Sequence, residues 1–393
     1  MSKLERLIQQ YCPDGVEYVK LDSVANICRG TRVVKSQLSD KGYPVYQNCL
    51  TPMGYFERSN CNAGITFVIC GGAAGNVGYT DVECWAADDC EFIIGGHQVI
   101  NRYIYYYLMT KQNYLLSKVR KASIPRLSPS IIKDLEIPLP PLPVQEEIVR
   151  ILDAFTELQA ELQAELQKRK QQYNYYLDNL LNFKNINRGG YQAEVRWMKM
   201  SEVFEIRNGY TPSKAKKEFW EGGTIPWFRM EDIRQNGRIL SDSILHITPK
   251  GVKGKGLFKA NSFILATTAT IGEHALIIAD SLANQRFTNL SIRKSLENEL
   301  SVKYVYYYFF VIDEWCKANT NVSNFASVDM SKFYNLLIPI PSIAEQQRIV
   351  AILDRFDTLT TDLTQGLPAE IEKRRQQYEY YRDKLLTFKR KGA

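Results

Sequence analysis

The chain has 393 residues, of which 45% are hydrophobic and 24% are charged, as is normal for a soluble globular protein. This length suits two or three domains. The formal net charge of +7 permits nucleic-acid binding but does not establish it. No apolar run reaches the roughly 18–20 residues that span a bilayer, and the charged N-terminal segment lacks the apolar core of a signal peptide. We therefore expect a cytoplasmic protein.

The cysteines and histidines indicate no metal site. None of the 8 cysteines forms a CxxC pair, and the 3 histidines are far apart in the sequence. We expect reduced cysteines in a cytosolic core and no metal ligands.

The first half of the chain predicts a mixed α/β unit followed by a long helix. Ile65–Cys70 is an apolar run suited to a buried strand, and Arg102–Tyr114 is typical of an aromatic-rich amphipathic helix. An extended Pro-rich entry precedes Val144–Phe183, which proline and glycine do not interrupt. Its apolar residues recur at intervals of three, four and seven, which predicts one stripe along a rod of roughly 60 Å.

The second half predicts the same order of elements. Ser262–Thr267 suits a buried strand, and Lys303–Lys317 suits an amphipathic helix. A second long helix, from about Ala344 to Phe388, has a matching apolar stripe. The interruption at Gly366–Pro368 should kink or loosen this helix.

The two halves are an internal duplication. Ile137–Phe155 reads IPLPPLPVQEEIVRILDAF, and Ile338–Phe356 reads IPIPSIAEQQRIVAILDRF. KRKQQYNYYLDNLLNF at Lys168–Phe183 matches KRRQQYEYYRDKLLTF at Lys373–Phe388. Repeats of this kind decide the architecture.

Weaker similarity continues upstream. Val16–Gly30 resembles Val195–Gly209, and Arg102–Leu108 resembles Lys303–Phe309. Between these segments the halves diverge almost completely. The chain therefore alternates variable globular domains with similar helices, and the predicted segments are domain 1–143, helix 144–183, linker 184–194, domain 195–341 and helix 342–393.

Pairing the two striped helices is the economical way to cover both stripes. If a pseudo-two-fold axis relates the halves, the paired helices are antiparallel and a domain lies at each end. The predicted fold class is therefore α+β, with two α/β domains separated by two long antiparallel helices that form a coiled-coil spacer.

The duplicated pattern IPxPxxxxQxxIVxILDxF, followed by QQYxYYxDxLLxF, resembles the specificity subunit of type I restriction-modification systems. The run TELQAELQAELQ at Thr156–Gln167 is similar to the four-residue helix repeat of one subclass of that family. The resemblance covers essentially the whole chain. Its globular domains correspond to target-recognition domains, which are the family's variable part.

This resemblance implies a function in bacterial defence. Each recognition domain would bind one half of a bipartite target in double-stranded DNA, and the helices would set the gap between the halves. Two methyltransferase subunits would dock on the chain and methylate adenines, and two motor-nuclease subunits would complete the restriction enzyme. S-adenosylmethionine, ATP and magnesium are expected on those partners, with no cofactor on this chain.

Catalytic motifs are missing from the sequence. There is no Asn/Asp-Pro-Pro-aromatic tetrapeptide of adenine methyltransferases, no Walker GxxxxGK[ST] motif and no convincing nuclease carboxylate cluster. We therefore expect a non-catalytic subunit rather than a fused methyltransferase-nuclease. A DNA-binding or scaffolding protein outside restriction remains the other alternative. The glycine-rich Gly71–Gly78 segment does not fit GxGxxG and is interpreted as a tight turn, with Asn76 as a possible base reader.

Candidate DNA-binding residues are of two kinds. Basic clusters suit phosphate neutralisation, although such clusters are more often solvated faces. The basic candidates are Lys118, Arg120, Lys121, Arg126, Lys214, Lys216, Lys253 and Lys255. Amides, hydroxyls and arginines near predicted strand ends suit base readout. The candidates for readout are Arg29, Arg32, Gln47, Asn76, Gln98, Asn208, Thr211, Arg229, Thr268, Gln285 and Arg286.

Tyrosines near the helix ends suggest either nucleic-acid stacking or a packed interface, and the apolar stripe favours the interface. Together with two glutamines at the helix starts, they form the predicted subunit-binding set. That set is Gln145, Tyr173, Tyr176, Gln346, Tyr378 and Tyr381.

The helix repeat should act as a ruler. Tyr173 lies 18 residues after Phe155, whereas Tyr378 lies 22 residues after Phe356, so the helices differ by one four-residue unit. Deleting Ala160–Gln163 removes roughly 6 Å of rise and roughly 400° of helix, a net rotation near 40°. One base pair of DNA corresponds to about 35° of rotation. We expect the deletion to shorten the non-specific gap by one base pair and to leave both half-sites unchanged.

Methylome sequencing of a strain that carries the deletion measures the gap. An unchanged gap with activity retained would show that the helices do not set the spacing.

Overall fold

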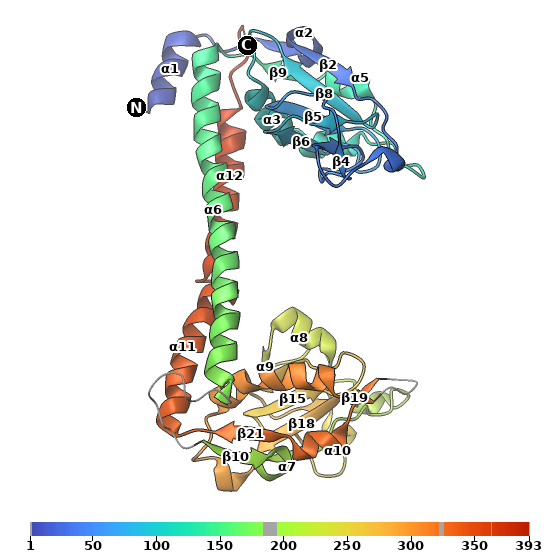
Figure 1. Ribbon diagram of the computed structural model, residues 1–393, viewed down its shortest axis with the longest axis vertical. Coiled ribbons are helices and arrows are strands. Elements are labelled where there is room, and N and C mark those ends of the chain that lie inside the picture. The colour runs from blue at the N-terminus through green and yellow to red at the C-terminus, as the bar shows by residue number, and fades with distance from the viewer. Residues whose placement is uncertain (1, 184–194, 322–325, 363, 393) are drawn as a thin grey trace. The chain divides into compact units, whose positions relative to one another are not determined.

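The computed structural model describes residues 2–183, 195–321, 326–362 and 364–392. The chain forms two compact units (Figure 1), of which the first contains Met1–Glu165 and Ala369–Ala393, and the second contains Leu166–Pro368. The predicted linker 184–194 lies outside the described residues. No helix within the described ranges is long and apolar enough to cross a membrane.

The first unit is a mixed α/β domain. Its elements in chain order are α1 (Lys3–Tyr11), β1 (Tyr18–Lys20), α2 (Leu21–Val24), β2 (Ala25–Arg29), η1 (Lys35–Gln37), β3 (Tyr43–Tyr46), β4 (Tyr55–Phe56), β5 (Ile65–Ile69), β6 (Val77–Thr80), β7 (Trp85–Ala86), β8 (Cys90–Gly95), α3 (Asn101–Thr110), α4 (Gln112–Ser117), α5 (Pro129–Lys133), β9 (Glu136–Pro138) and the start of α6 (Leu142–Leu181).

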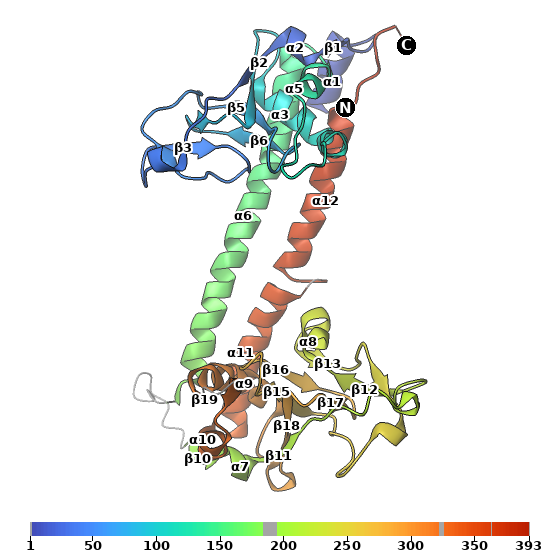
Figure 2. The same ribbon diagram turned by 90° about the vertical axis from the view of Figure 1, so that its right-hand side faces the viewer.

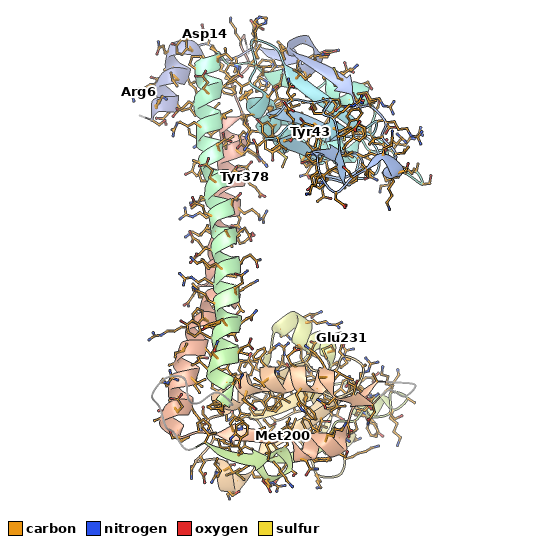
Figure 3. The ribbon with its side chains drawn as sticks, in the orientation of Figure 1. Arg6, Asp14, Tyr43, Met200, Glu231 and Tyr378 are labelled. Carbon is orange, nitrogen blue, oxygen red and sulfur yellow. The ribbon has the colours of Figure 1, made fainter. Side chains whose placement is uncertain are left out.

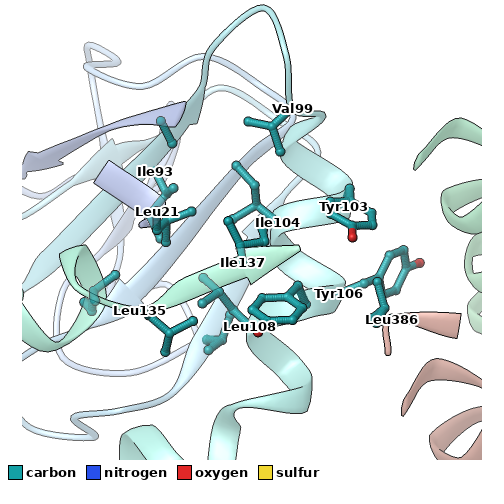
Figure 4. Packing of buried hydrophobic residues seen from close by; sticks show 14 of the residues in the cluster. Leu21, Ile93, Val99, Tyr103, Ile104, Tyr106, Leu108, Leu135, Ile137 and Leu386 are labelled. Atoms are coloured by element: carbon teal, nitrogen blue, oxygen red, sulfur yellow. The ribbon is translucent and has the colours of Figure 1, made fainter. Parts of the chain in front are cut away.

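An antiparallel sheet in the order β2-β8-β5-β6 forms the centre of this unit. Every residue of β5 is buried, which confirms the strand predicted at Ile65–Cys70. Aromatic and aliphatic side chains of α3, among them Tyr103 and Ile104, pack with Ile93 of β8 in the core (Figure 4). A small sheet, β4-β3-β7, lies on the side of the unit away from α6 (Figure 2).

The second unit has the same kind of core. Its elements are β10 (Arg196–Lys199), α7 (Met200–Val203), β11 (Phe204–Asn208), η3 (Lys217–Phe219), β12 (Ile225–Phe228), α8 (Met230–Asn236), β13 (Ile239–Leu240), β14 (His246–Ile247), η4 (Pro249–Gly251), β15 (Ser262–Ala266), β16 (His274–Ile277), β17 (Leu282–Ala283), β18 (Phe287–Ile292), η5 (Lys294–Leu296), α9 (Val302–Ala318), β19 (Thr320–Asn321), β20 (Ser327–Val328), α10 (Met330–Asn335), β21 (Leu337–Ile340) and α11 (Ile343–Thr361).

The central sheet of the second unit has the order β11-β18-β15-β16-β13, and β14-β12-β17 forms a smaller sheet beside it. β15 is buried throughout, as the sequence predicted for Ser262–Thr267. In both units the small sheet contains a parallel pair, β3 with β7 and β12 with β17. The duplication inferred from the sequence is therefore confirmed in the topology.

Long helices pack in antiparallel pairs within each unit (Figures 1 and 2). In the first unit, α12 (Leu367–Leu385) lies along the first part of α6, with the rings of Phe155 and Tyr381 stacked at 5.6 Å. In the second, α11 lies along the last part of α6, with the rings of Tyr176 and Phe356 stacked at 5.1 Å. In the sequence repeat, Phe155 corresponds to Phe356 and Tyr176 corresponds to Tyr381. The two stacked pairs are therefore equivalent, but α6 supplies the phenylalanine in the first unit and the tyrosine in the second. α11 ends at Thr361, before the predicted interruption at Gly366–Pro368, and α12 begins within it, at Leu367.

A buried glutamine secures the start of α6. The Gln145 side chain lies in the first turn and has no exposed surface. Its Nε2 donates to the carbonyl oxygens of Pro140 (2.7 Å) and Gln98 (2.9 Å). Its Oε1 accepts from the Ile100 N–H at 3.0 Å. The side chain thus joins the helix start to the loop that enters α3.

The second unit repeats this arrangement at the start of α11. Gln346 is also fully buried, and its Nε2 donates to the carbonyl oxygens of Pro341 and Glu299, each at 2.8 Å. Its Oε1 accepts from the Ser301 N–H at 2.8 Å. A partner cannot touch a side chain without exposed surface, so these bonds give Gln145 and Gln346 an intramolecular role in place of the predicted subunit contact.

A tyrosine–aspartate pair adds a second anchor to each helix, about two turns after the glutamine. Tyr106 of α3 donates to Asp153 at 2.5 Å, and Arg102 Nε donates to the same carboxylate at 2.8 Å. In the second unit, Tyr307 donates to Asp354 at 2.5 Å, and Lys303 donates to it at 2.9 Å. Each copy of the duplicated segment therefore has the same structural role, which is to attach a long helix to the aromatic-rich helix (α3 or α9) of its own unit.

The glutamine anchor predicts a stability effect. Gln145→Met keeps the volume but leaves two carbonyl oxygens and one N–H without their partner, which costs roughly 2–4 kcal/mol. We expect a lower first transition in thermal unfolding followed by circular dichroism, and faster hydrogen exchange at Ile100. Gln171→Met, on an exposed position of the same helix, is the matched control and should change stability by less than about 0.5 kcal/mol. Equal stability of the two variants would refute the anchor.

Candidate nucleic-acid interface

Each unit has a polar corner where the end of one central strand meets the small sheet. In the first unit, Arg29 ends β2 and pairs across the sheet with Glu91 of β8. The next residue, Gly30, donates its N–H to the Cys90 carbonyl at 3.0 Å. A Cβ at Gly30 would lie 2.1 Å from the Ala87 carbonyl oxygen, so only glycine fits this close approach.

The second unit builds the same corner from a different set of side chains. Asn208 ends β11 and pairs with Thr288 of β18. Gly209 donates its N–H to the Phe287 carbonyl at 2.8 Å, and a Cβ there would lie 2.2 Å from the Asn284 carbonyl oxygen. The backbone framework is thus repeated while the paired side chains differ.

The small sheets extend this equivalence. Tyr46 pairs with Ala86 in the first unit, and Phe228 pairs with Ala283 in the second. These registers relate five positions of the first unit to five of the second. The equivalent pairs are 29 and 208, 47 and 229, 88 and 285, 89 and 286, and 91 and 288. The polar corner of the first unit is defined as Arg29, Gln47, Asp88, Asp89, Glu91 and Arg126. The polar corner of the second unit is defined as Asn208, Thr211, Arg229, Gln285, Arg286 and Thr288.

The first polar corner opens into a cavity of about 320 Å³. Its charged lining residues are Arg29, Asp88, Glu91, Arg120 and Arg126. Hydrogen bonds hold several of these groups: Arg29 Nε donates to the Asp88 carbonyl at 2.8 Å, and Arg126 donates to Asp89 at 3.1 Å. Gln47 Nε2 lies 3.5 Å from the Asp88 carboxylate. The predicted residues Arg29, Gln47, Arg120 and Arg126 are therefore brought together.

Glu91 is the most buried charged group of this corner, with 4% of its surface exposed. Burial raises the pKa of its carboxyl group, and the positive charge of Arg29 opposes that shift in part. Among the described residues, no hydrogen bond to the Glu91 carboxylate is formed. Its charge therefore acts mainly on the arginine that faces it across the sheet.

The second polar corner is a network of uncharged groups edged by arginines. Thr288 donates to the Asn208 side-chain oxygen at 3.2 Å and lies 3.0 Å from the Thr267 hydroxyl. The Thr211 hydroxyl donates to the Gln285 side chain. Arg286 is exposed, and Arg229 Nε is buried without a hydrogen bond in the part of the chain that is described.

Two lysine-containing loops flank the second polar corner: the first contains Lys214 and Lys216, and the second contains Lys253 and Lys255. The Tyr210 hydroxyl donates to the Gly251 carbonyl (3.1 Å) and accepts from the Lys253 N–H (2.6 Å), which holds the second loop against the turn after Asn208. All four predicted lysines of these loops are exposed, and among the described residues none forms an ion pair. These lysines are Lys214, Lys216, Lys253 and Lys255.

The glycine-rich segment is a tight turn, as its sequence predicted. Gly72 and Gly75 have φ of +84° and +87°, and the Asn76 side chain donates to the Ala73 carbonyl at 2.8 Å. Gly72 donates its N–H to the Pro125 carbonyl (3.1 Å), so this turn supports the loop that carries Arg126.

Other predicted residues lie elsewhere. Gln98 follows the far end of β8 from Glu91, outside the first polar corner, and its carbonyl accepts the Gln145 bond. Lys118 directly follows α4, and its ammonium group lies over the Tyr114 ring, while Lys121 is exposed in the following loop. Arg32 is exposed two residues after Gly30. Thr268 bridges to Ser327 next to Thr267.

The helix tyrosines divide into two kinds. Tyr173 and Tyr378 are partly buried and pack against the hydrophobic cores of their units, and Figure 3 shows Tyr378 on α12. Tyr176 and Tyr381 are each 39% exposed on the helix surfaces. The latter pair presents the larger exposed surface, and the predicted subunit contacts stay a prediction.

Sequence reasoning missed the acidic members of the first polar corner and Thr288 of the second, although it included Thr211. Asp88, Asp89 and Glu91 have a charge that discourages a DNA-binding interpretation. The signal that could have found Glu91 is strand register, since it faces Arg29. No group of three or more potential metal ligands is found over the ranges that the structure describes.

Comparisons with known proteins agree with this architecture. The family model of the type I restriction modification DNA specificity domain matches residues 13–172 and 192–373. The EcoprrI specificity subunit of Escherichia coli is 54% identical over 204 residues, which cover 50% of this chain and 51% of that protein. A putative type I restriction enzyme specificity subunit of Haemophilus influenzae is 31% identical over 406 residues, or 98% of each chain.

A solved structure has the same fold. The crystal structure of a type I restriction-modification S subunit from M. genitalium superposes with a TM-score of 0.56 at 17% identity, and the match covers 94% of this chain and 95% of that one. Because the family model matches both halves and a relative matches nearly the full length, the chain belongs to the type I restriction-modification specificity subunits.

Proposed function

We propose that this chain binds a bipartite target in double-stranded DNA, each unit recognising one half, and directs methyltransferase and motor-nuclease subunits to it. The observation that carries the proposal is the repeated polar corner. The same backbone framework appears in both units with different hydrogen-bonding groups, as two recognition surfaces for two different half-sites require.

The charges of the second unit support DNA as the ligand. Its basic loops present lysines without ion pairs beside the polar corner, and phosphate contacts of this kind position a protein on the duplex while base contacts specify the sequence. Arginine, asparagine, glutamine and threonine are the side chains that read base edges in the major groove.

The partner subunits complete the function. Two methyltransferase subunits would dock on the helices, with Tyr176 and Tyr381 as the contact candidates. S-adenosylmethionine would bind to those subunits, and ATP with magnesium would bind to the motor-nuclease subunits, so that this chain supplies recognition without a catalytic centre. The complex would act on DNA in the cytoplasm.

The division of labour predicts a simple assay result. The purified chain should transfer no methyl group from labelled S-adenosylmethionine to DNA, because catalysis requires the methyltransferase subunits. Together with those subunits it should produce N6-methyladenine within one bipartite motif, as read by single-molecule sequencing. Methyl transfer by the chain alone would contradict the proposal.

The exposed residues Lys253 and Lys255 lead to a prediction about how DNA affinity depends on salt concentration. Lys253→Ala/Lys255→Ala should weaken DNA binding by the methyltransferase complex for all sequences alike. The slope of log K against log salt should fall by roughly 1.8, because each phosphate contact contributes about 0.9. Fluorescence anisotropy over a salt series measures this slope.

The same loop region supplies a matched control. Lys250 and Lys259 are paired with Glu218 (3.2 Å) and Asp280 (2.7 Å), so replacing both with alanine should change the slope less. Equal slopes for the two double variants would show that Lys253 and Lys255 do not contact phosphates.

A further inference from the structure

We propose that each unit has one reader position, at the strand end before a glycine that lies close to a facing carbonyl oxygen, and that Arg29 reads a guanine in the first half-site while Asn208 reads an adenine in the second. This inference rests on the proposed function, since it names the base pair that each polar corner would recognise. It starts from the equivalence of the two cross-strand pairs, Arg29 with Glu91 and Asn208 with Thr288.

The backbone holds both reader positions rigidly. Each reader is paired within its sheet, and the glycine that follows donates to the neighbouring strand. The close approach of Gly30 and Gly209 to a facing carbonyl oxygen leaves no room for a side chain at either place. A recognition side chain needs such a fixed base, because a loosely held donor loses geometric selectivity.

Arg29 is preset for two parallel hydrogen bonds. Its Nε is occupied by the Asp88 carbonyl at 2.8 Å, which fixes the plane of the guanidinium. Within the described residues, its two terminal nitrogens make no hydrogen bond, and the residue is exposed. Guanine offers O6 and N7, two acceptors at the spacing of this fork.

Glu91 supports this choice of base. Its carboxylate is buried on the face of the sheet that Arg29 shares, so the arginine stays close to a fixed negative charge. In a guanine–cytosine pair, the cytosine presents its N4 amino group, a hydrogen-bond donor, in the major groove. A nearby carboxylate favours such a donor over another acceptor.

Asn208 has the complementary chemistry. Its side-chain oxygen accepts from Thr288 at 3.2 Å, which orients the amide, and a carbonyl oxygen has a second lone pair for another donor. An amide that both donates and accepts matches N7 and the N6 amino group of adenine. Asn208 is exposed at the end of β11, the strand end that corresponds to that of Arg29 in β2.

The test uses the full chain in complex with its methyltransferase subunits, in cells that lack other adenine methylation, with the methylome read by single-molecule sequencing. The wild-type complex must first yield one bipartite motif. If it yields none, the proposed function fails, whatever the variants do.

Arg29→Lys keeps the positive charge but removes the planar fork. We expect discrimination at one guanine–cytosine pair of the first half-site to fall roughly 5- to 150-fold, with the second half-site unchanged. An unchanged motif overturns the inference. A uniform drop in methylation of all sites also overturns it, because Arg29 would then contact only phosphate.

Arg29→Asn/Glu91→Thr installs the second unit's pair in the first unit and removes the buried carboxylate that would otherwise lose its cationic neighbour. It should shift the preference at that same position from guanine–cytosine to adenine–thymine. Asn208→Lys should relax one adenine–thymine pair of the second half-site alone. Arg6→Lys, on α1 outside both polar corners (Figure 3), is the matched control and should leave the motif unchanged. Changes in both half-sites from either reader variant would refute one reader per unit.

Discussion

The architecture of both units depends on one buried amide. Gln145 and Gln346 each place a side chain with three hydrogen bonds between the proline-rich strand end, the loop before the aromatic helix and the first turn of a long helix. An amide buried without partners would be costly, so these bonds enforce a single geometry at the helix start. The tyrosine–aspartate anchor, about two turns later, then fixes the rotation of the helix about its axis.

Each unit also needs chain segments that are remote in sequence. The core of the first unit includes Leu386, with Tyr378 packed against it, from the C-terminal end of the chain. The core of the second includes Leu177 and Leu181 from the end of α6. The entropy of closing such loops grows only slowly with their length, so burial of large apolar side chains can offset it. The first unit is therefore built from two separate segments of the sequence, whereas the second is continuous but includes the end of α6. Truncation at either helix end removes core residues.

The sequence predicted the repeated, periodic parts well and the register-dependent parts poorly. The long helices, their interruption and the two buried strands follow from apolar spacing, which local sequence records directly. Gln145 was misread because a glutamine on a helix is usually exposed, and only the fold brings three backbone groups to it. The short parallel pairs, such as β3 with β7, leave too brief a pattern to detect. Glu91 was not predicted as part of the site, because only the pairing of β2 with β8 places it opposite Arg29.

The divergence of the two polar corners has a physical cause in how they are built. Their shape comes from backbone bonds, such as Gly30 N–H to the Cys90 carbonyl and Gly209 N–H to the Phe287 carbonyl, and from glycines that no side chain can replace. The reader side chains contribute little to this framework. The equivalent strand ends accordingly have the pair Arg29 and Glu91 in the first unit and the pair Asn208 and Thr288 in the second. A scaffold that separates backbone geometry from side-chain identity can change the groups it presents without refolding, and that is the property that a variable recognition surface requires.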